Sequence, residues 1–274
     1  MKVVILNSGM GTRMGVLTKE HPKCMTEIAE NETILSAQLK AVAEAGIRDV
    51  VITTGYFNDV LVEYCESLGL PLNIEYVFNP LYDKTNYIYS IYCARETLRD
   101  EDIVLLHGDM VFAQDVFQKV IDSPESCMAV SSTLPLPEKD FKAVIKDGKI
   151  IAVGIEFFEN ALAAQPLYKL LKKDWNVWLD RIAAFSENGT TSCYAEKAFN
   201  EISETVCVPR STWRTLCAAR STTQRTSRWY QKDTKHSLAE TYNRQKRCRI
   251  GIFFWSFRYL QTCASVLYFT GMTE

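Results

Sequence analysis

The chain has 274 residues, of which 47% are hydrophobic and 23% charged, and its net charge is -2. This composition is typical of a soluble globular protein and excludes a disordered or fibrous chain. No apolar run reaches the length of about 18 residues that would predict a membrane span. The nine cysteines include no Cys-x-x-Cys pair, which argues against a zinc site or a disulfide framework and favours free thiols in the cytoplasm.

Short apolar runs alternate with amphipathic segments over the first part of the chain. The runs predict buried strands at 3–6, 49–54, 72–77 and 102–106. The segments between them predict helices at 33–45, 58–68 and 85–98. Gly46 and Gly69 follow the first two helices, as helix-ending glycines do. This alternation predicts an α/β fold with a Rossmann-like, mostly parallel sheet flanked by helices.

The pattern changes after the fourth strand. Further strands are expected at 127–132, 141–145 and 149–153. The Asp147-Gly148 turn between the last two predicts a hairpin attached to the sheet, which makes the sheet mixed. A helix that carries Trp175 and Trp178 is expected over 167–185.

Charge is distributed unevenly along the chain. Residues 1–204 hold 19 Lys or Arg against 30 Asp or Glu, whereas residues 205–274 hold 12 against 3. So abrupt a change predicts a domain over residues 1–205 and a separate basic tail over residues 206–274.

A glycine-rich turn follows the first strand, at the edge where open parallel sheets bind ligands. Its sequence is Leu6-Asn7-Ser8-Gly9-Met10-Gly11-Thr12-Arg13. The two glycines let the backbone N–H groups approach a polyphosphate, and Arg13 can pair with phosphate. The pattern is neither a P-loop nor a dinucleotide fingerprint, and a purely structural turn is the alternative interpretation.

Two charged residues can join this turn in one site. Lys23 follows Pro22 on a restrained loop and offers a second phosphate contact, although a solvated surface lysine is the alternative. Asp109 follows the apolar run at 102–106, where a carboxylate can hold Mg²⁺. A turn aspartate without a ligand is the alternative for Asp109.

Together these motifs resemble the nucleotidyltransferase family that activates sugar phosphates and phospho-alcohols, over roughly residues 1–204. The resemblance rests on four segments: Gly9 to Arg13, Leu17-Thr18, Pro22-Lys23 and Gly108-Asp109. It implies a fold of the nucleotide-diphospho-sugar transferase type.

Other segments are similar to the branch of this family that uses CTP, which includes bacterial phosphocholine and 2-aminoethylphosphonate cytidylyltransferases. They are Phe78-Asn79 and Asn86 to Ser90. Trp175, Trp178 and Tyr194-Ala195-Glu196 are similar to the phosphonate members.

The resemblance implies a cytoplasmic enzyme that transfers a cytidylyl group from CTP to phosphocholine or 2-aminoethylphosphonate and releases pyrophosphate. Mg²⁺ is the implied cofactor, and no nucleic acid partner is implied. Arg13 and Lys23 would be the catalytic residues, and Asp109 would bind the metal. The implied nucleotide-binding residues are Leu6, Asn7, Ser8, Gly9, Gly11, Thr12, Asn79, Asn86 and Ser90.

Such an acceptor carries an amino or quaternary ammonium group, which aromatic faces and carboxylates bind. The candidate acceptor-binding residues are Tyr87, Tyr89, Glu156, Trp175 and Trp178. Core packing is the alternative for the aromatic ones.

The family carries a second metal-binding aspartate in a late Cys-x-Glu-Ile-Asp segment, which this chain lacks. Synonymous codons for residues 217–227 can be written so that a shifted frame encodes that segment, so a frameshift near Pro209 is one hypothesis. A basic appendage that binds a membrane surface or RNA is the other.

Two further functions stay open. A sugar-1-phosphate nucleotidylyltransferase would use the same glycine turn beside a sugar-binding pocket. An inactive nucleotide-binding module would be compatible with the missing aspartate.

Overall fold

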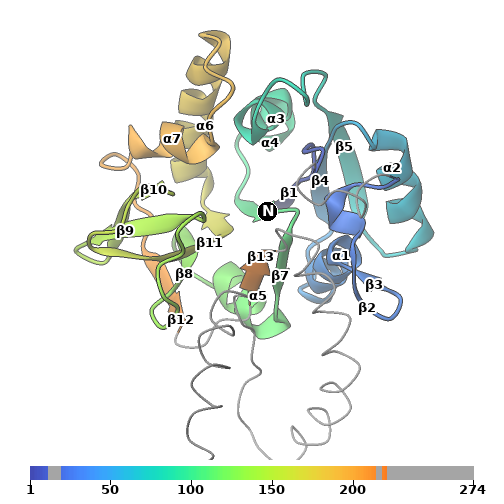
Figure 1. Cartoon of the computed structure of the whole chain (residues 1–274), viewed down its shortest axis with the longest axis horizontal. Coiled ribbons are helices and arrows are strands. Elements are labelled where there is room, and N and C mark those ends of the chain that lie inside the picture. The colour runs from blue at the N-terminus through green and yellow to red at the C-terminus, as the bar shows by residue number, and fades with distance from the viewer. Residues whose placement is uncertain (12–19, 214–217, 221–274) are drawn as a thin grey trace, which may run out of the picture.

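The computed structural model describes residues 1–11, 20–213 and 218–220, and every structural statement below concerns these residues. A nine-stranded mixed sheet forms the centre of the molecule (Figure 1). Four parallel neighbours make up one half of it: β6 (Ile103–His107), β1 (Lys2–Leu6), β4 (Asp49–Thr54) and β5 (Asn73–Phe78). The predicted α/β fold with a mostly parallel, Rossmann-like sheet is confirmed.

The other half of the sheet is organised by β11 (Ala161–Leu170), which pairs antiparallel with β6. β11 also pairs antiparallel with β8 (Cys127–Ser131) and with β9 (Lys142–Lys146). β9 and β10 (Lys149–Gly154) form the predicted hairpin. The turn residues Asp147 and Gly148 have φ values of 50° and 79°, which suit a tight hairpin turn.

Helices cover both faces of the sheet. Side chains along the inner strands point alternately to the two faces, so each face carries an apolar core that helices bury. On β1, Val3 and Ile5 face one core and Val4 faces the other. The first core is covered by α1 (Ile34–Glu44), α2 (Asn58–Ser67) and α5 (Gln114–Ile121). The second is covered by α3 (Tyr87–Cys93), α4 (Arg95–Leu98), α6 (Lys172–Glu187) and α7 (Ala195–Asn200).

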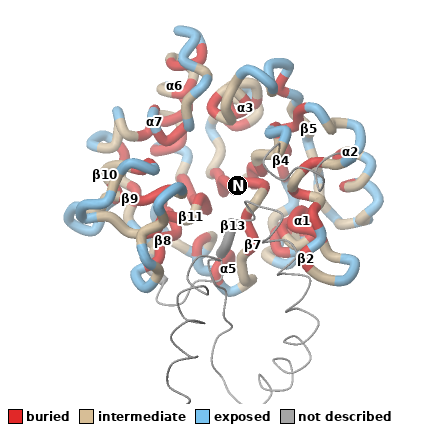
Figure 2. Tube along the Cα trace, in the orientation of Figure 1, coloured by how far each residue is buried: buried red, intermediate tan, exposed pale blue. Residues whose placement is uncertain are grey.

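Burial follows this layered arrangement. Figure 2 shows buried positions along the strands and on the inner sides of the helices, with exposed positions on the outer loops. Small elements complete the fold: the short helix η2 (Lys23–Met25) and the two-stranded sheet of β2 (Glu27–Ala29) and β3 (Glu32–Thr33). Within the described part of the chain, no helix is long and apolar enough to cross a membrane.

Two helix predictions need correction. The helix expected over 167–185 begins only at Lys172, because residues 167–170 belong to β11. All four of these residues are buried, and the strand pairs with β6 on one side and β8 on the other. The single helix expected over 85–98 is divided into α3 and α4 at Ala94.

The start of the basic segment 206–274 takes part in the sheet. Val206 and Val208 are buried in the second core. β12 (Arg210–Trp213) then pairs parallel with β8. β13 (Ala218–Arg220) pairs antiparallel with β7 (Met110–Phe112), directly after Asp109. The remainder of the predicted tail lies outside the described residues.

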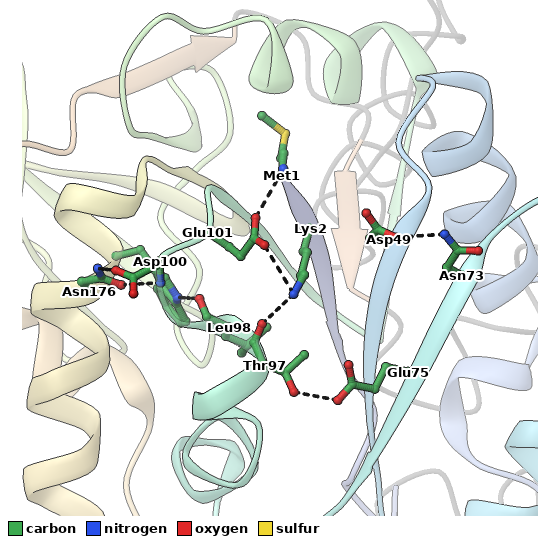
Figure 3. A network of polar contacts seen from close by, with 11 residues as sticks. Met1, Lys2, Asp49, Asn73, Glu75, Thr97, Leu98, Asp100, Glu101 and Asn176 are labelled. Carbon is green, nitrogen blue, oxygen red and sulfur yellow. Dashed lines mark hydrogen bonds and ion pairs between the residues drawn. The ribbon is translucent and has the colours of Figure 1, made fainter.

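The amino ends of the strands are linked by a polar network (Figure 3). The Lys2 ammonium donates to the carbonyl of Thr97 at 2.8 Å and forms an ion pair with Glu101 at 3.5 Å. Asp100 and Asn176 join α4 to α6 through two further hydrogen bonds. These contacts fix α4 and α6 to the amino ends of the strands, and the cleft described next lies at the carboxyl ends.

Candidate active site

A cleft of about 350 Å³ lies at the carboxyl ends of β1, β5 and β6. Parallel α/β sheets bind ligands at the carboxyl ends of their strands, because the loops that follow the strands diverge there. The cleft brings together most of the residues singled out in the sequence: Leu6, Asn7, Ser8, Gly9, Gly11, Lys23, Asn79, Asn86, Tyr87, Ser90 and Asp109. Thr12 and Arg13 lie outside the described residues.

The glycine turn after β1 is anchored to the sheet at one end and open at the other. The Asn7 N–H donates to the carbonyl of Thr53 at 3.1 Å. A side chain built on Gly9 would meet no described atom within 4 Å, so this backbone borders open space. Gly11 has a φ of 64°, a conformation that glycine adopts readily. The turn therefore presents a small, accessible backbone surface to the cleft.

Gly108 holds the turn and the strand β6 in close contact. A Cβ atom at this position would lie 1.6 Å from Oδ1 of Asn7 and 2.7 Å from the carbonyl oxygen of Leu6. The Gly108 N–H also donates to that carbonyl at 3.1 Å. Only glycine allows this approach, which sets the position of the next residue, Asp109.

Lys23 and Asp109 meet inside the cleft. The Lys23 Nζ atom lies 2.8 Å from Oδ2 of Asp109, and the two side chains are only 17% and 15% exposed. Lys23 opens the short helix η2, whereas Asp109 follows β6. The neighbouring Cys24 also lines the cleft, but burial raises the pKa of its thiol, so it is a neutral group and not a nucleophile.

Asn79, Asn86 and Ser90 lie where β5 leads into α3. The Asn79 side-chain amide donates to Thr85 at 3.1 Å and to Ser90 at 3.0 Å, and its oxygen accepts from the Leu81 N–H. The Asn86 side chain caps the start of α3 by accepting from the Tyr87 N–H. All three predicted nucleotide-binding residues therefore line the cleft and also hold its wall together.

Four aromatic rings form a second wall, which we call the aromatic wall: Tyr87, His107, Phe141 and Tyr194. The ring centroids of successive neighbours are 4.7 Å apart for Tyr87 and His107, 6.1 Å for His107 and Phe141, and 5.0 Å for Phe141 and Tyr194. The Tyr194 and Tyr87 centroids, at 5.7 Å, close the circuit. All four residues line the cleft.

Only Tyr87 in this wall was singled out as an acceptor-binding residue in the sequence. His107 stands directly before Gly108-Asp109, and this adjacency was an available signal. Phe141 precedes the hairpin and Tyr194 precedes α7. Their convergence depends on tertiary packing, which local patterns do not reveal.

Four proposed acceptor-binding residues do not line the cleft. Trp175 and Trp178 are buried on the apolar face of α6, where their indole N–H groups donate to the carbonyls of Leu98 at 2.9 Å and Ala195 at 3.0 Å. Their assignment to the acceptor is wrong, because packing against the sheet uses the whole side chain. Tyr89 packs against Tyr92, and Glu156 is exposed beyond β10.

A buried carboxylate lies behind the aromatic wall. Glu196, in the first turn of α7, is 1% exposed. Its Oε1 accepts a hydrogen bond of 2.8 Å from the Tyr168 hydroxyl, and its Oε2 accepts one from the Tyr87 hydroxyl. The His107 Nε2 atom lies 3.8 Å from Oε1. The wall and the carboxylate thus form one connected structure.

Comparisons with known proteins agree with this architecture. Residues 3–238 match the family described as "MobA-like NTP transferase domain". The solved structure of the CTP:phosphocholine cytidylyltransferase of Streptococcus pneumoniae superposes with a TM-score of 0.70 at 18% identity, covering 85% of this chain and 98% of that chain. The inositol-1-phosphate CTP transferase of T. maritima gives a TM-score of 0.67 at 19% identity, over 86% and 96%. At these identities the likeness establishes the fold.

Curated relatives include several cytidylyltransferases. The CTP:phosphoglutamine cytidylyltransferase of Campylobacter jejuni is 33% identical over 55% of this chain and 61% of its own length. The CMP-5'-(3-aminopropyl)phosphonate synthase of Streptomyces rubellomurinus is 34% identical over 50% of this chain and 21% of its own length. The choline-phosphate cytidylyltransferase of Streptococcus pneumoniae is 31% identical over 38% and 43%. The matched region therefore spans less than two thirds of each of these relatives.

These matches bear on two of the expectations. The family match continues past Pro209, the site of the suspected frameshift, and none of these findings supports that frameshift. The predicted nucleotide-diphospho-sugar transferase fold and the nucleotidyltransferase family are confirmed. The chain belongs to the MobA-like NTP transferase family.

Proposed function

We propose that this nucleotidyltransferase transfers a cytidylyl group from CTP to a small phosphorylated amino alcohol or aminophosphonate, and that pyrophosphate leaves. The observation that carries the proposal is the juxtaposition of a polar end of the cleft, with Lys23 and Asp109, and an aromatic wall. The names of three relatives support it, because phosphoglutamine, aminopropylphosphonate and choline phosphate all carry an amino or ammonium group.

The polar end suits a nucleoside triphosphate. The backbone around Gly9 borders open space, so its N–H groups can approach phosphate oxygens. Lys23 lines the same cleft as the turn, and its ammonium would neutralise charge on the α-phosphate or on the leaving pyrophosphate. Arg13 stays a prediction for the same role.

Asp109 is the residue that would hold Mg²⁺. Within residues 1–11, 20–213 and 218–220, no group of three or more His, Cys, Asp or Glu side chains is placed to hold a metal ion. Asp109 still fits, since Mg²⁺ in nucleotide sites is commonly held by one or two carboxylates together with substrate phosphates and water. When bound, the ion would neutralise the charge that develops on the phosphates.

The reaction needs alignment and charge neutralisation more than proton transfer. An acceptor phosphate or phosphonate oxygen, already ionised, forms a bond to the α-phosphorus, and the bond from that phosphorus to the β-phosphate oxygen breaks. The electron pair leaves with pyrophosphate. Lys23 would stabilise this charge, and the aromatic wall would hold the far end of the acceptor.

A sugar-1-phosphate nucleotidyltransferase is the second candidate, because such enzymes also match. The mannose-1-phosphate guanylyltransferase catalytic subunit beta of Danio rerio is 31% identical over 40% of this chain and 31% of its own length. A neutral sugar would use the aromatic wall for stacking and would not need the charge behind it.

The test is a pyrophosphate-release assay on the full chain with Mg²⁺. CTP, UTP, GTP and ATP are each combined with phosphocholine, 2-aminoethylphosphonate and glucose 1-phosphate. Release with CTP and a cationic acceptor alone supports the proposal. Release with glucose 1-phosphate supports the second candidate. Nucleotide binding without release with any pair would support an inactive binding module and overturn both enzymatic assignments.

A further inference from the structure

Glu196 is a buried carboxylate directly behind the aromatic wall, and the mechanism above does not use it. The side chain is 1% exposed and does not line the cleft itself. It is connected to the cleft through Tyr87, whose hydroxyl donates to Oε2, and it approaches His107 at 3.8 Å. Both rings belong to the wall.

Burying a carboxylate is costly, and hydrogen bonds from neutral hydroxyl groups compensate only part of that cost. The hydroxyls of Tyr87 and Tyr168 each hold one oxygen of Glu196 but bring no formal charge. His107, whose Nε2 atom lies 3.8 Å from Oε1, is the one partner in the wall that could carry a positive charge. Inside a protein a charge on Glu196 would be weakly screened, so its potential would extend through the wall into the cleft. A cation bound at the wall would be attracted by this potential.

The hydrogen bond from Tyr87 adds a second effect. A phenol that donates to a carboxylate is polarised towards the phenolate, which makes the face of its ring more electron-rich. Such a face binds an ammonium group more strongly. The carboxylate and the ring therefore favour the same kind of ligand.

Other charged groups near the wall are placed differently. The Lys142 ammonium donates to the carbonyls of Pro137 and Ile155, each at 2.6 Å, and burial lowers its pKa. Lys139 and Asp140 also line the cleft. Asp140 is half-buried, so it is an alternative carboxylate that could attract a cation in place of Glu196.

We infer that Glu196 determines specificity for acceptors with a cationic head group, by acting through Tyr87, and that Tyr168 is a positioning residue that fixes the carboxylate. This inference rests on the proposed function, because it concerns the acceptor end of the same cleft. Glu196 would thus determine whether the cleft prefers a cationic or a neutral acceptor, although the acceptor would not contact Glu196.

The first test compares acceptors of equal shape and different charge. Phosphocholine is paired with 3,3-dimethylbutyl phosphate, in which carbon replaces the quaternary nitrogen. We expect Glu196→Gln to lower kcat/KM for phosphocholine at least about tenfold, mainly through KM, as expected for loss of a charge that attracts the cation. The neutral analogue should change less than about twofold, since it gains nothing from the charge.

Two variants control this experiment. Asp140→Asn removes the rival carboxylate and should leave the preference for phosphocholine in place. Tyr168→Phe keeps Glu196 but releases one of its oxygens, so it should reduce the preference by a smaller factor. Because Tyr168→Phe is a mild change, it also serves as the decisive variant if Glu196→Gln does not fold, as judged by thermal unfolding.

The second test does not depend on turnover. Binding of tetramethylammonium and choline chloride to the full chain is measured by titration calorimetry for the wild type, Glu196→Gln and Asp140→Asn. Binding that weakens at least about tenfold in Glu196→Gln alone supports the inference. Such weakened binding would support the inference about Glu196 even if the chain releases no pyrophosphate from CTP. A lack of release would overturn only the proposed function.

Three outcomes would overturn the inference itself. One is equal phosphocholine kinetics in Glu196→Gln and the wild type, which would leave the proposed function standing. Another is a loss of preference in Asp140→Asn instead of Glu196→Gln. The third is the absence of any ammonium binding by the wild-type chain.

Discussion

The Nζ atom of Lys23 lies 2.8 Å from Oδ2 of Asp109, although 86 positions separate the two residues in the sequence. The proposed phosphate-binding cation and the proposed metal ligand are therefore direct neighbours. A metal ion and Lys23 would compete for the same carboxylate oxygen. We expect Lys23 to exchange this partner for a phosphate oxygen when Mg²⁺ and nucleotide bind, so the two residues should be probed separately.

Asp109→Asn should reduce Mg²⁺-dependent turnover at least about 100-fold, because the amide keeps the volume but loses the charge that attracts a hard cation. The measurement is pyrophosphate release over a Mg²⁺ titration, together with the thermal midpoint. Asp115→Asn, at an exposed position in the first turn of α5, is the matched control. Unchanged activity with unchanged metal dependence would reduce Asp109 to a turn residue.

Lys23→Ala should also lower turnover at least about 100-fold, since it removes a positive charge from the path of the polyphosphate. The structure limits the cost to stability, because Lys23 has some exposure and its pair with Asp109 is a single contact. Lys173→Ala, on the exposed side of α6, is the control. Near-normal activity of Lys23→Ala would remove this residue from the triphosphate site.

Two glycines of the cleft should respond in opposite ways. Gly108→Ala should lower both the thermal midpoint and turnover, because its Cβ would lie 2.7 Å from the backbone oxygen of Leu6 and would displace the Asn7 side chain and Asp109. Gly9→Ala should keep the thermal midpoint, since its Cβ meets no described atom, but should raise KM for CTP by crowding the phosphates. Thermal unfolding and steady-state kinetics on both variants distinguish these effects. A Gly9→Ala variant with unchanged KM would place the triphosphate elsewhere.

The elements that could be predicted from sequence are those with local signals. Residues 3–6 form a continuous apolar run, residues 50–52 form the apolar centre of the strand 49–54, and Asp147-Gly148 marks the hairpin. The glycine turn and Asp109 each follow a strand with a clear pattern, so their place at the carboxyl ends of the strands could be inferred. Lys23 was predicted instead from its position after Pro22 on a restrained loop.

The strand β11 could not be recognised in the same way. It contains Pro166, which cannot donate to a neighbouring strand, and the pairing with β8 shifts register between Ala164 and Tyr168. It also contains Lys169, which is buried because its ammonium donates to the carbonyls of Ile121 and Ser123. Neither Pro166 nor Lys169 is typical of a central strand. The extended conformation of β11 is explained only by its pairing with β6, β8 and β9.

The misassigned tryptophans lead to the last prediction, which separates the core from the acceptor site. Trp175→Phe should lower the free energy of unfolding by about 1–3 kcal/mol, because it leaves the Leu98 carbonyl without its donor and opens a small cavity. The thermal midpoint should fall by about 2–4 °C for each kcal/mol. KM for the acceptor should not change, since this side chain does not line the cleft. Tyr194→Ala is the matched contrast: it removes a ring of the aromatic wall that is 39% exposed, so it should raise the acceptor KM at a smaller cost in stability. If Trp175→Phe raised that KM while Tyr194→Ala did not, the acceptor would bind beside α6 and the aromatic wall would be structural.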